Sequence, residues 1–245
     1  MKRALKAITT MILLMLFAIS CNKPTDPDNG GNDVQNDSIV DNGGSLNGYE
    51  YIDLGLSSGT LWATCNLGAS CPEEIGDYIA WGETAPKELY DWNSYRYCVF
   101  AIDHYDMTKY CTEAIWVQSE FIDNLTVLEP DDDAALANWG AGWRMPTRED
   151  WEELCQETTC IQTTQNGVSG RLVTGKNGNS IFLPATGFRL DGELVCPNLG
   201  VYWSSSLYTG SPDRAWSFHF DNDEYHVCGT YERNRGQVVR AVYDE

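Results

Sequence analysis

The sequence predicts an α+β fold of short, mostly antiparallel strands with two helices in the middle of the chain. Three observations support this prediction. Residues 49–245 contain all nine tryptophans and all thirteen tyrosines, which is enough apolar area to build a core. Asn-Gly pairs, which favour hairpin turns, lie between apolar runs in the second half of the chain. Two capped, apolar stretches between residues 131 and 156 indicate the helices.

The chain from residue 49 onward is predicted to begin with short strands. Residues 49–54 and 60–64 form strands around a turn at Ser57-Ser58-Gly59, and residues 77–81 form another short strand. Residues 87–128 are rich in aromatic residues but only weakly periodic, which indicates loops with a helical turn.

The two helices are predicted next. Asp131-Asp132-Asp133 precede an apolar run that ends at Trp139, and acidic side chains at a helix start satisfy its free N–H groups. Thr147 and Asp150 have the spacing of a capping box, which predicts a second helix that ends near Gln156.

The rest of the chain is predicted to be β structure. Asn166-Gly167 and Asn177-Gly178 are hairpin signals. Trp216, Phe218 and Phe220 alternate with polar residues, which predicts a strand with one buried and one exposed face. The predicted strands cover residues 171–174, 181–183, 202–206, 215–220, 226–228 and 238–242.

Residues 1–20 have the pattern of a secretory signal peptide: a basic start followed by a short apolar run. The run is too short to cross a bilayer, which needs about twenty residues. It ends in Ala18-Ile19-Ser20-Cys21, which resembles a bacterial lipobox, whose cysteine is lipidated and becomes the mature N-terminus. We therefore expect Cys21 to anchor the protein to a membrane, with an ordinary secretory cleavage site as the alternative.

Residues 21–48 are rich in Asn, Asp and Gly and contain no aromatic residue. Such a segment cannot bury enough apolar area to offset its ordering entropy, so a flexible tether is predicted. Residues 49–245 show no second linker and no repeat, which predicts one domain. The net charge of −20 excludes nucleic acid as a partner, because a polyanion requires a positive surface.

No catalytic site is predicted. Gly55–Gly59 matches the G-x-S-x-G nucleophile elbow, but the elbow needs a helix directly after its serine, and a strand is predicted there. His104, His219 and His226 have no catalytic or metal-binding spacing. No pair of carboxylates has a spacing that indicates a glycosidase.

No cofactor is predicted, with Ca²⁺ as an alternative. Glu129-Pro130-Asp131 and Asp221-Asn222-Asp223-Glu224 carry oxygen ligands for Ca²⁺, but a helix cap and a solvated turn explain them better. Besides Cys21 the chain has eight cysteines, and an even number in an exported chain predicts at least one disulfide. Cys65/Cys71 and Cys155/Cys160 are close enough in sequence to form local pairs.

Six strings follow one another along residues 49–245: YEYIDLGLSSGTLWA, GDYIAWGET, DDDAALANWGAGWRMPTREDW, NGNSIFLP, VYWSSS and RGQVVRAV. Together they resemble the Fibrobacter succinogenes major paralogous domain, which is common in lipoproteins of Bacteroidota and related to the DUF1566 group. The string GWRMPTREDW also resembles the WRLPTEAEW stretch of formylglycine-generating-enzyme-like proteins.

This relation implies a C-type-lectin-like fold, in which the N- and C-terminal strands pair and a long irregular β region follows two helices. We expect Arg144 to pair with a buried carboxylate or carbonyl group. The catalytic activity of those relatives is not implied, because the stretch that matches their reactive cysteine pair has serines. The residues assigned to the structural motif of the fold are Trp143, Arg144, Pro146, Trp203 and Arg240.

The aromatic and polar residues near the C-terminus are the candidates for ligand binding, because Tyr and Trp supply rigid contact area with a polar end. Strand alternation predicts that Trp203 and Trp216 are buried. Residues 221–234 are the region where we expect the site. The candidates expected to be exposed are Tyr208, Asn222, Tyr225, Tyr231, Arg233 and Asn234.

The sequence thus predicts a cell-envelope lipoprotein, lipid-anchored in the outer membrane and facing the cell surface or the periplasm. Its lectin-like domain is expected to bind an extracellular glycan or protein without catalysis. The alternatives are an enzyme that acts on cell-surface polymers, and a structural or tip component of a surface assembly.

Overall fold

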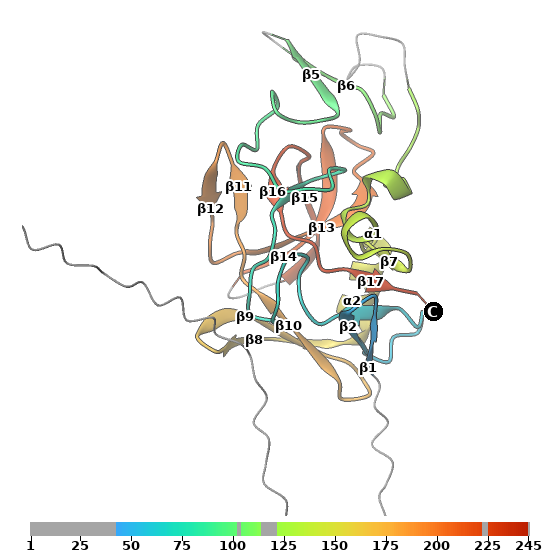
Figure 1. Cartoon of the computed structure of the whole chain (residues 1–245), viewed down its shortest axis with the longest axis vertical. Helices are drawn as coiled ribbons and strands as arrows, with labels where there is room; N and C mark the ends of the chain where they lie inside the picture. Colours follow the sequence, from blue (N-terminus) through green and yellow to red (C-terminus); the bar gives the residue numbers. More distant parts are fainter. Residues whose placement is uncertain (1–42, 102–103, 114–121, 222–224, 245) are drawn as a thin grey trace, which may run out of the picture. The chain divides into compact units, whose positions relative to one another are not determined.

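The computed structural model describes residues 43–101, 104–113, 122–221 and 225–244. Within these ranges the chain is mostly antiparallel strand with two α-helices, so the predicted α+β class is confirmed (Figure 1). No helix of these ranges is long and apolar enough to span a membrane.

The first and last strands of the described chain lie in one sheet. In order across the sheet, its strands are β1 (Gly43–Leu46), β2 (Tyr49–Asp53), β3 (Leu61–Ala63), β17 (Val242–Tyr243) and β7 (Trp143–Arg144). Val242 of β17 lies opposite Trp62 of β3 and Arg144 of β7. The N- and C-terminal strands therefore share a sheet, but the last strand pairs with β3, the third strand, and not with β1 or β2 as the predicted pairing of the terminal strands would require.

The folded part begins earlier than the predicted boundary at residue 49. Strand β1 pairs with β2 through a tight turn at Asn47-Gly48, where both residues have positive φ angles of 53° and 89°. An Asn-Gly pair favours this kind of hairpin turn. Asn47 also donates from Nδ2 to Trp139 O at 2.8 Å. The assignment of residues 43–48 to the tether was wrong, because composition alone concealed a hairpin signal.

The other described strands form four antiparallel sheets (Figure 1). One contains, in order, β12 (Glu193–Val195), β11 (Phe188–Leu190), β16 (Gly236–Gln237) and β4 (Ile79–Ala80). A second sheet contains β8 (Thr159–Gln165), β9 (Val168–Thr174) and β10 (Ser180–Pro184). A third contains β13 (Gly200–Leu207), β14 (Arg214–Phe220) and β15 (Tyr225–Glu232). The fourth is a hairpin of β5 (Cys98–Ala101) and β6 (His104–Met107).

Two predicted regions differ from the structure. The β5–β6 hairpin lies in the part of the chain that was predicted to be loops with a helical turn. Of the strand predicted at residues 238–242, only Val242 lies in a strand, β17, and the residues before it connect β16 to β17. Its intervening carbonyl groups accept hydrogen bonds from the backbone of Trp203, Leu67 and Ala63 at 2.9 to 3.1 Å. This segment therefore connects the two sheets through the core, which a local pattern does not reveal.

Both helices begin with the predicted caps. In α1 (Ala134–Trp139), the Asp133 carboxylate accepts hydrogen bonds from the backbone of Ala135 and Leu136, and a 3-10 turn at Pro130–Asp132 precedes it. In α2 (Arg148–Glu157), Thr147 and Asp150 form the reciprocal bonds of a capping box. Glu129 precedes the 3-10 turn, but its side chain makes no cap bond there and pairs with Lys109, so the tripeptide Glu129-Pro130-Asp131 does not itself cap α1.

Strand β14 does not alternate as predicted. Phe218 and Phe220 are buried, but Trp216 is only partly buried. The Trp216 ring packs edge-to-face with the partly exposed Tyr208, with the ring centroids 5.1 Å apart, and the guanidinium carbon of Arg148 lies 4.1 Å from its centroid, so it packs on surface side chains. The expectation that Trp216 is a core residue was therefore wrong, whereas Trp203 is fully buried.

Arg144 pairs with carboxylates, as expected, but they are not buried: the Asp150 side chain is 12% exposed and that of Asp244 is 53% exposed. Its Nη1 lies 2.5 Å from Asp150 Oδ2, and its Nε lies 2.6 Å from Asp244 Oδ2. The Arg144 guanidinium holds the pKa of Asp244 below its usual range. The ion pairs thus join the start of α2 to the end of the chain, beside the buried Trp143 and Pro146.

The cysteines of the described ranges do not form the expected local disulfides. Burial raises the pKa of the Cys65 and Cys160 thiols, and a domain of this size has enough core to fold without covalent links. Cys21 and the side chain of Cys228 lie outside the described residues. The cysteines present as thiols are Cys65, Cys71, Cys98, Cys111, Cys155, Cys160 and Cys196.

Candidate functional site

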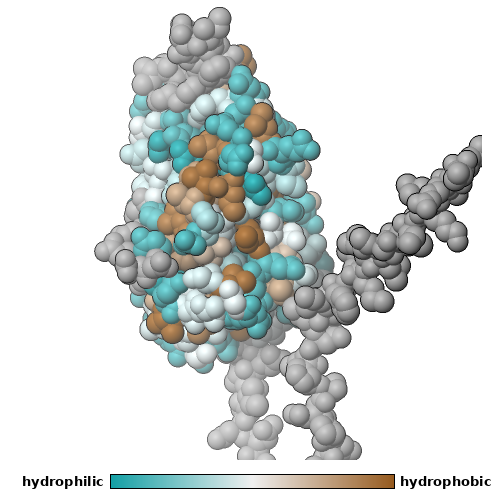
Figure 2. Space-filling model, turned by 90° about the vertical axis from the view of Figure 1, so that its left-hand side faces the viewer, coloured by the Kyte–Doolittle hydropathy of each residue, from teal (hydrophilic) through white to brown (hydrophobic). Residues whose placement is uncertain are grey.

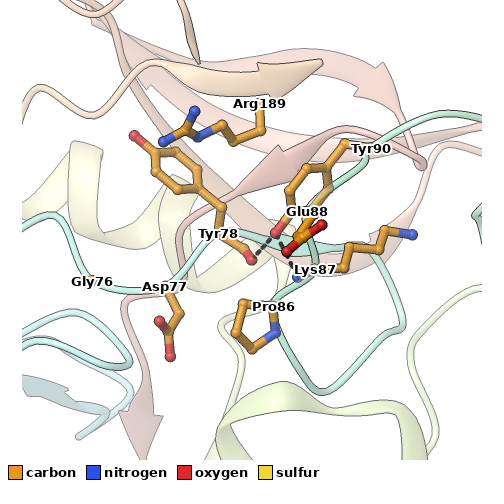
Figure 3. Close-up of a pocket in the computed structure, with 8 residues that line it drawn as sticks. All are labelled: Gly76, Asp77, Tyr78, Pro86, Lys87, Glu88, Tyr90 and Arg189. Atoms are coloured by element: carbon orange, nitrogen blue, oxygen red, sulfur yellow. Dashed lines mark hydrogen bonds between the residues drawn. The ribbon is translucent and has the colours of Figure 1, made fainter. Parts of the chain in front are cut away.

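The structure contains an open pocket of about 370 Å³, which we name the tyrosine–arginine pocket (Figure 3). Its walls come from the segment before β4, the loop after β4, and strand β11. Parts of the chain more than a hundred residues apart therefore meet here. The residues that line it are Gly76, Asp77, Tyr78, Pro86, Lys87, Glu88, Tyr90 and Arg189.

Gly76 fixes the start of the pocket wall. Its φ angle is 79°, and a Cβ atom there would collide with the carbonyl oxygen of Leu67. The following residue, Asp77, donates from its backbone N to that same oxygen at 2.8 Å. This bond holds the backbone directly before β4 and places the Asp77 side chain at the pocket (Figure 3).

Two tyrosines form rigid walls of the pocket. The Tyr90 hydroxyl donates to Tyr78 O and accepts from Lys87 N at 3.2 Å, and the Tyr78 hydroxyl donates to Thr186 O. Burial raises the pKa of both phenols. They therefore stay neutral at physiological pH and supply aromatic surface rather than acid–base chemistry.

Arg189 lies over the tyrosine wall. Its guanidinium carbon is 5.2 Å from the centroid of the Tyr78 ring, within the range of a cation–π contact (Figure 3). Among the described residues it makes one hydrogen bond, from Nη1 to Gly192 O at 3.4 Å. A guanidinium carries five donors, so most of its hydrogen-bonding capacity is open to a ligand.

The charged side chains of the pocket differ in their availability. Lys87 Nζ is held at 2.8 Å from Glu83 Oε1 and 3.0 Å from Ser94 O, so it is occupied within the loop. The carboxylates of Asp77 and Glu88 stand at the pocket (Figure 3). An arginine, two carboxylates and an aromatic wall can together bind a ligand that has hydroxyl groups and one apolar face.

Apolar side chains gather on the face of the molecule that carries β11 and β12 (Figure 2). Leu89, in the loop that lines the pocket, is 44% exposed, and Leu194 of β12 is 39% exposed. The mouth of the pocket therefore has an apolar border, which is typical of a contact surface.

A second hollow, of about 190 Å³, borders the same loop and the same strand β11, and we name it the polar recess. It contains one of the predicted ligand-binding residues, Asn234. The residues that line it are Asp91, Trp92, Leu190, Asp191, Glu232, Asn234 and Arg235.

Two of the predicted ligand-binding residues are partly exposed. Tyr208 packs edge-to-face with Trp216, with their ring centroids 5.1 Å apart. Tyr231 lies 5.5 Å from the Phe188 ring and 5.4 Å from the Arg235 guanidinium, close to the polar recess. Asn222 and the side chain of Tyr225 lie outside the described residues.

Arg233 and Asn234 are buried, with 0% and 3% exposure, so the expectation that they are exposed was wrong. Arg233 donates from Nη1 to Pro212 O at 2.8 Å and from Nη2 to Lys109 O at 3.0 Å. Segments far apart in the sequence thus cover the turn after β15, and no local pattern indicates this. Arg233 cannot contact an external ligand in this conformation, whereas Asn234 lines the polar recess.

The alternative catalytic and metal sites have structural roles or lie outside the described residues. Ser57 Oγ donates to Glu157 Oε1 at 2.7 Å, and Ser58 Oγ to Glu153 Oε2 at 2.6 Å, so this turn is attached to α2. No helix follows Ser57, as a nucleophile elbow would need. In the described ranges no group of His, Cys, Asp and Glu is placed to hold a metal. Residues 222–224 of the second calcium candidate are not described.

The sequence did not single out the tyrosine–arginine pocket. Asp77 and Tyr78 were noted only as the start of a strand, and Arg189 carried no signal. The one available indication was the aromatic content of the residues after β4, whose weak periodicity is typical of a loop held by tertiary contacts.

Comparisons of the chain with family models, with curated proteins and with solved structures give no match. The resemblance to the Fibrobacter succinogenes major paralogous domain therefore stays a prediction, as does the C-type-lectin-like fold.

Proposed function

We propose that this protein is a non-catalytic saccharide-binding lipoprotein of the bacterial cell envelope, and that the tyrosine–arginine pocket is its binding site. The observation that carries the proposal is the Arg189 guanidinium, which lies 5.2 Å from the Tyr78 ring centroid with most of its donors unused. A structural arginine would have these donors satisfied by protein acceptors.

Saccharides match this arrangement better than other small ligands do. A sugar ring has an apolar face that packs on aromatic and apolar surface, and hydroxyl groups that both donate and accept hydrogen bonds. Arg189 offers donors, and Asp77 and Glu88 offer acceptors. The apolar border at Leu89 adds surface for the ring face.

The remaining parts of the proposal rest on the sequence. The lipobox-like Cys21 would anchor the chain to the outer membrane, on the cell surface or on its periplasmic side, with residues 22–42 as a tether. The six strings that resemble the Fibrobacter succinogenes major paralogous domain, and the lectin-like fold they imply, support a binding module rather than an enzyme.

A glycan array tests the proposal with the purified full chain and the variant Arg189→Ala. Loss of a charged hydrogen bond of about 1.5–3 kcal/mol predicts a weakening of about 10- to 100-fold. Arg96→Ala is the matched control, because its side chain is 56% exposed and it does not line the pocket. An empty array, or binding that Arg189→Ala leaves unchanged, would refute the proposed site.

A second candidate function is docking of a protein partner at β12. This strand is outermost in its sheet, so its free backbone groups can pair with a strand of another chain, and Leu194 adds apolar area. Co-purification of a stoichiometric partner that Leu194→Glu abolishes would favour this function. Ile161→Glu on β8 is the control, since Ile161 is 56% exposed on another sheet.

A further inference from the structure

Strand β8 is the outermost strand of its sheet and lacks the features that usually prevent an edge strand from pairing with another chain. It is seven residues long, and its register with β9 is continuous from Thr159 to Gln165. Residues 158–170 contain no charged residue and no proline. Natural edge strands are usually protected by charges, prolines, bulges or short length. The outer edge of β8 is therefore suited to pair with a further strand.

The turn after β8 determines which backbone groups lie at this edge. Asn166 and Gly167 have φ angles of 49° and 86°, as in a two-residue hairpin turn, so the flanking residues exchange both of their hydrogen bonds. Bonded and non-bonded pairs alternate along an antiparallel ladder. Ser169, which lies opposite Thr164, accordingly bonds on the β10 side, where its carbonyl oxygen accepts from Ala185 N at 2.8 Å. The residues whose N–H and C=O groups point away from β9 are therefore Cys160, Gln162 and Thr164.

The charge of the chain favours this edge as a contact between copies. A net charge of −20 makes two copies repel each other on close approach, so a contact between them is least costly where carboxylates are absent. The uncharged run of residues 158–170 is such a place. Ile161 is 56% exposed within it and would lose apolar surface to water on pairing.

The point where the chain enters the domain lies near the sheet that contains β8. Gly43, at the start of β1, lies opposite Ile52 of β2. The next residue of β2, Asp53, accepts through its carbonyl oxygen from Asn177 Nδ2 at 2.9 Å and from Asn179 Nδ2 at 2.8 Å, both in the turn between β9 and β10. Copies that are anchored in one membrane through the expected tether would therefore hold this sheet in the same layer, at a high local concentration.

We propose that β8 pairs antiparallel with β8 of a second copy of this chain, around a two-fold axis at Gln162. Gln162 then lies opposite Gln162 of the other copy, and Cys160 lies opposite Thr164. The outward N–H and C=O groups of these residues bond across the axis, so two three-stranded sheets become one continuous sheet. The inference goes beyond the proposed function, because it uses no residue of the tyrosine–arginine pocket.

The charges that flank β8 suit this antiparallel arrangement. Near one end of the strand, Lys176 Nζ lies 3.1 Å from Glu157 Oε2, and the Lys176 side chain is 67% exposed. Near the other end, the Glu73 carboxylate accepts from Gln165 Nε2 at 2.7 Å. The two-fold axis brings the Lys176 end of one copy beside the Glu73 end of the other, so charges of opposite sign approach each other at both ends.

Co-purification of two full chains with different affinity tags, expressed in one cell, tests the proposal. We expect the wild-type chains to be recovered together. Gln162→Glu in both copies places two carboxylates opposite each other and should reduce the co-purified fraction about fivefold, as should Gln162→Lys in both. Gln162→Glu in one copy with Gln162→Lys in the other should restore recovery to the wild-type level, because the two charges now attract.

Val99 provides the matched control. It is 58% exposed on β5, which belongs to another sheet. Val99→Glu and Val99→Lys change the charge of the chain as the Gln162 variants do, and they should leave recovery unchanged. Arg189→Ala should also leave it unchanged, so the result is independent of the saccharide site.

Gln162→Pro tests the backbone pairing itself. Because the N–H group of Gln162 points away from β9, proline removes a bond of the proposed interface and none of the hairpin. The variant should keep the circular dichroism spectrum of the wild type and reduce the co-purified fraction at least about tenfold. If this variant does not fold, the Gln162→Glu and Gln162→Lys pairs decide the question.

Three results would overturn the proposal. The first is wild-type chains that do not co-purify. The second is Gln162→Glu chains that co-purify as well as the wild type does, because a contact elsewhere would then join the copies. The third is a different protein that is recovered in place of the second copy and that Gln162→Glu releases, because β8 would then pair with that protein.

Discussion

Two pairs of arginines in this protein differ in how their donors are used. Arg240 and Arg233 are fully buried, and each makes several hydrogen bonds to protein acceptors. Arg189 and Arg235 stand at the two hollows, stacked on aromatic rings, and most of the Arg189 donors and the Arg235 Nε have no acceptor among the described residues. Arg240 and Arg233 thus hold the fold, whereas most donors of Arg189 stay available to a ligand in the tyrosine–arginine pocket.

Arg240 shows how uncharged hydrogen-bond acceptors stabilise a guanidinium in the core. Arg240 donates to Asn66 Oδ1 at 2.8 Å and to the carbonyl oxygens of Ala63, Thr64 and Phe182 at 2.7 to 3.0 Å. Burial lowers the pKa of this guanidinium, but its bonds to four oxygens offset the desolvation cost. Arg240 therefore ties the C-terminal segment to β3 and β10.

The largest effect is predicted for Arg240→Met. The substitution removes the Arg240 donors to one side-chain oxygen and three carbonyl oxygens, at about 1–3 kcal/mol for each oxygen left unpaired, before relaxation. We expect the free energy of unfolding in urea at pH 7 to fall by more than about 3 kcal/mol. Arg240→Lys should restore only part of this loss, because a single ammonium cannot replace the planar fork. A loss below about 1 kcal/mol for Arg240→Met would contradict the structural role.

Asp132 extends the comparison to a buried carboxylate that accepts several hydrogen bonds from protein donors. It accepts from Lys109 Nζ and Tyr110 Oη, each at 2.6 Å, and from the Tyr97 hydroxyl. Burial opposes ionisation of Asp132, but these donors outweigh it and hold its pKa below the usual range. Its stabilisation is therefore present above the pKa of an unfolded aspartate, about 3.9, and is lost as the pH falls through the lower folded pKa.

We expect Asp132→Asn to cost about 2 kcal/mol at pH 7, because charge-assisted hydrogen bonds become neutral ones. The difference in unfolding free energy between the variant and the wild type should shrink as the pH is lowered below about 4. Burial raises the pKa of Asp133, but this residue is present in both proteins, so its contribution to the pH dependence cancels in the difference. A difference that stays constant from pH 7 to pH 3 would show that the Asp132 charge does not matter.

The smallest effect on stability is predicted for Arg189→Ala. Only one long hydrogen bond, of 3.4 Å, is lost within the described residues. The free energy of unfolding should therefore change by no more than about 0.5 kcal/mol, while saccharide binding in the tyrosine–arginine pocket weakens about 10- to 100-fold. A destabilisation as large as that of Arg240→Met would place Arg189 among the structural arginines and remove the contrast between the two pairs.

Local chemistry explains which parts of the fold the sequence predicted. The capping box at Thr147 and Asp150 and the acidic start of α1 depend on neighbouring residues, so their patterns are visible in the sequence. The partial exposure of Trp216 depends on its packing against Tyr208 and Arg148, which the apolar alternation of Trp216, Phe218 and Phe220 does not contain.

The site could be predicted only in part, because tertiary contacts decide which polar side chains are satisfied. Arg233 and Asn234 are adjacent in the sequence and were assigned the same role. The donors of Arg233 nevertheless bond to protein acceptors inside the core, whereas Asn234 lines a hollow. Tyr78 and Arg189 meet only after β4 and β11 join the same sheet through β16. No spacing in the sequence indicates that these two residues lie side by side.

A crystal structure of the full chain soaked with an oligosaccharide that the array identifies would test the central claim most directly. The account predicts a sugar ring against Tyr78 with hydroxyl groups bonded to Arg189. A ligand bound elsewhere, with no contact to Arg189, would contradict the claim that the unused donors of Arg189 mark the binding surface.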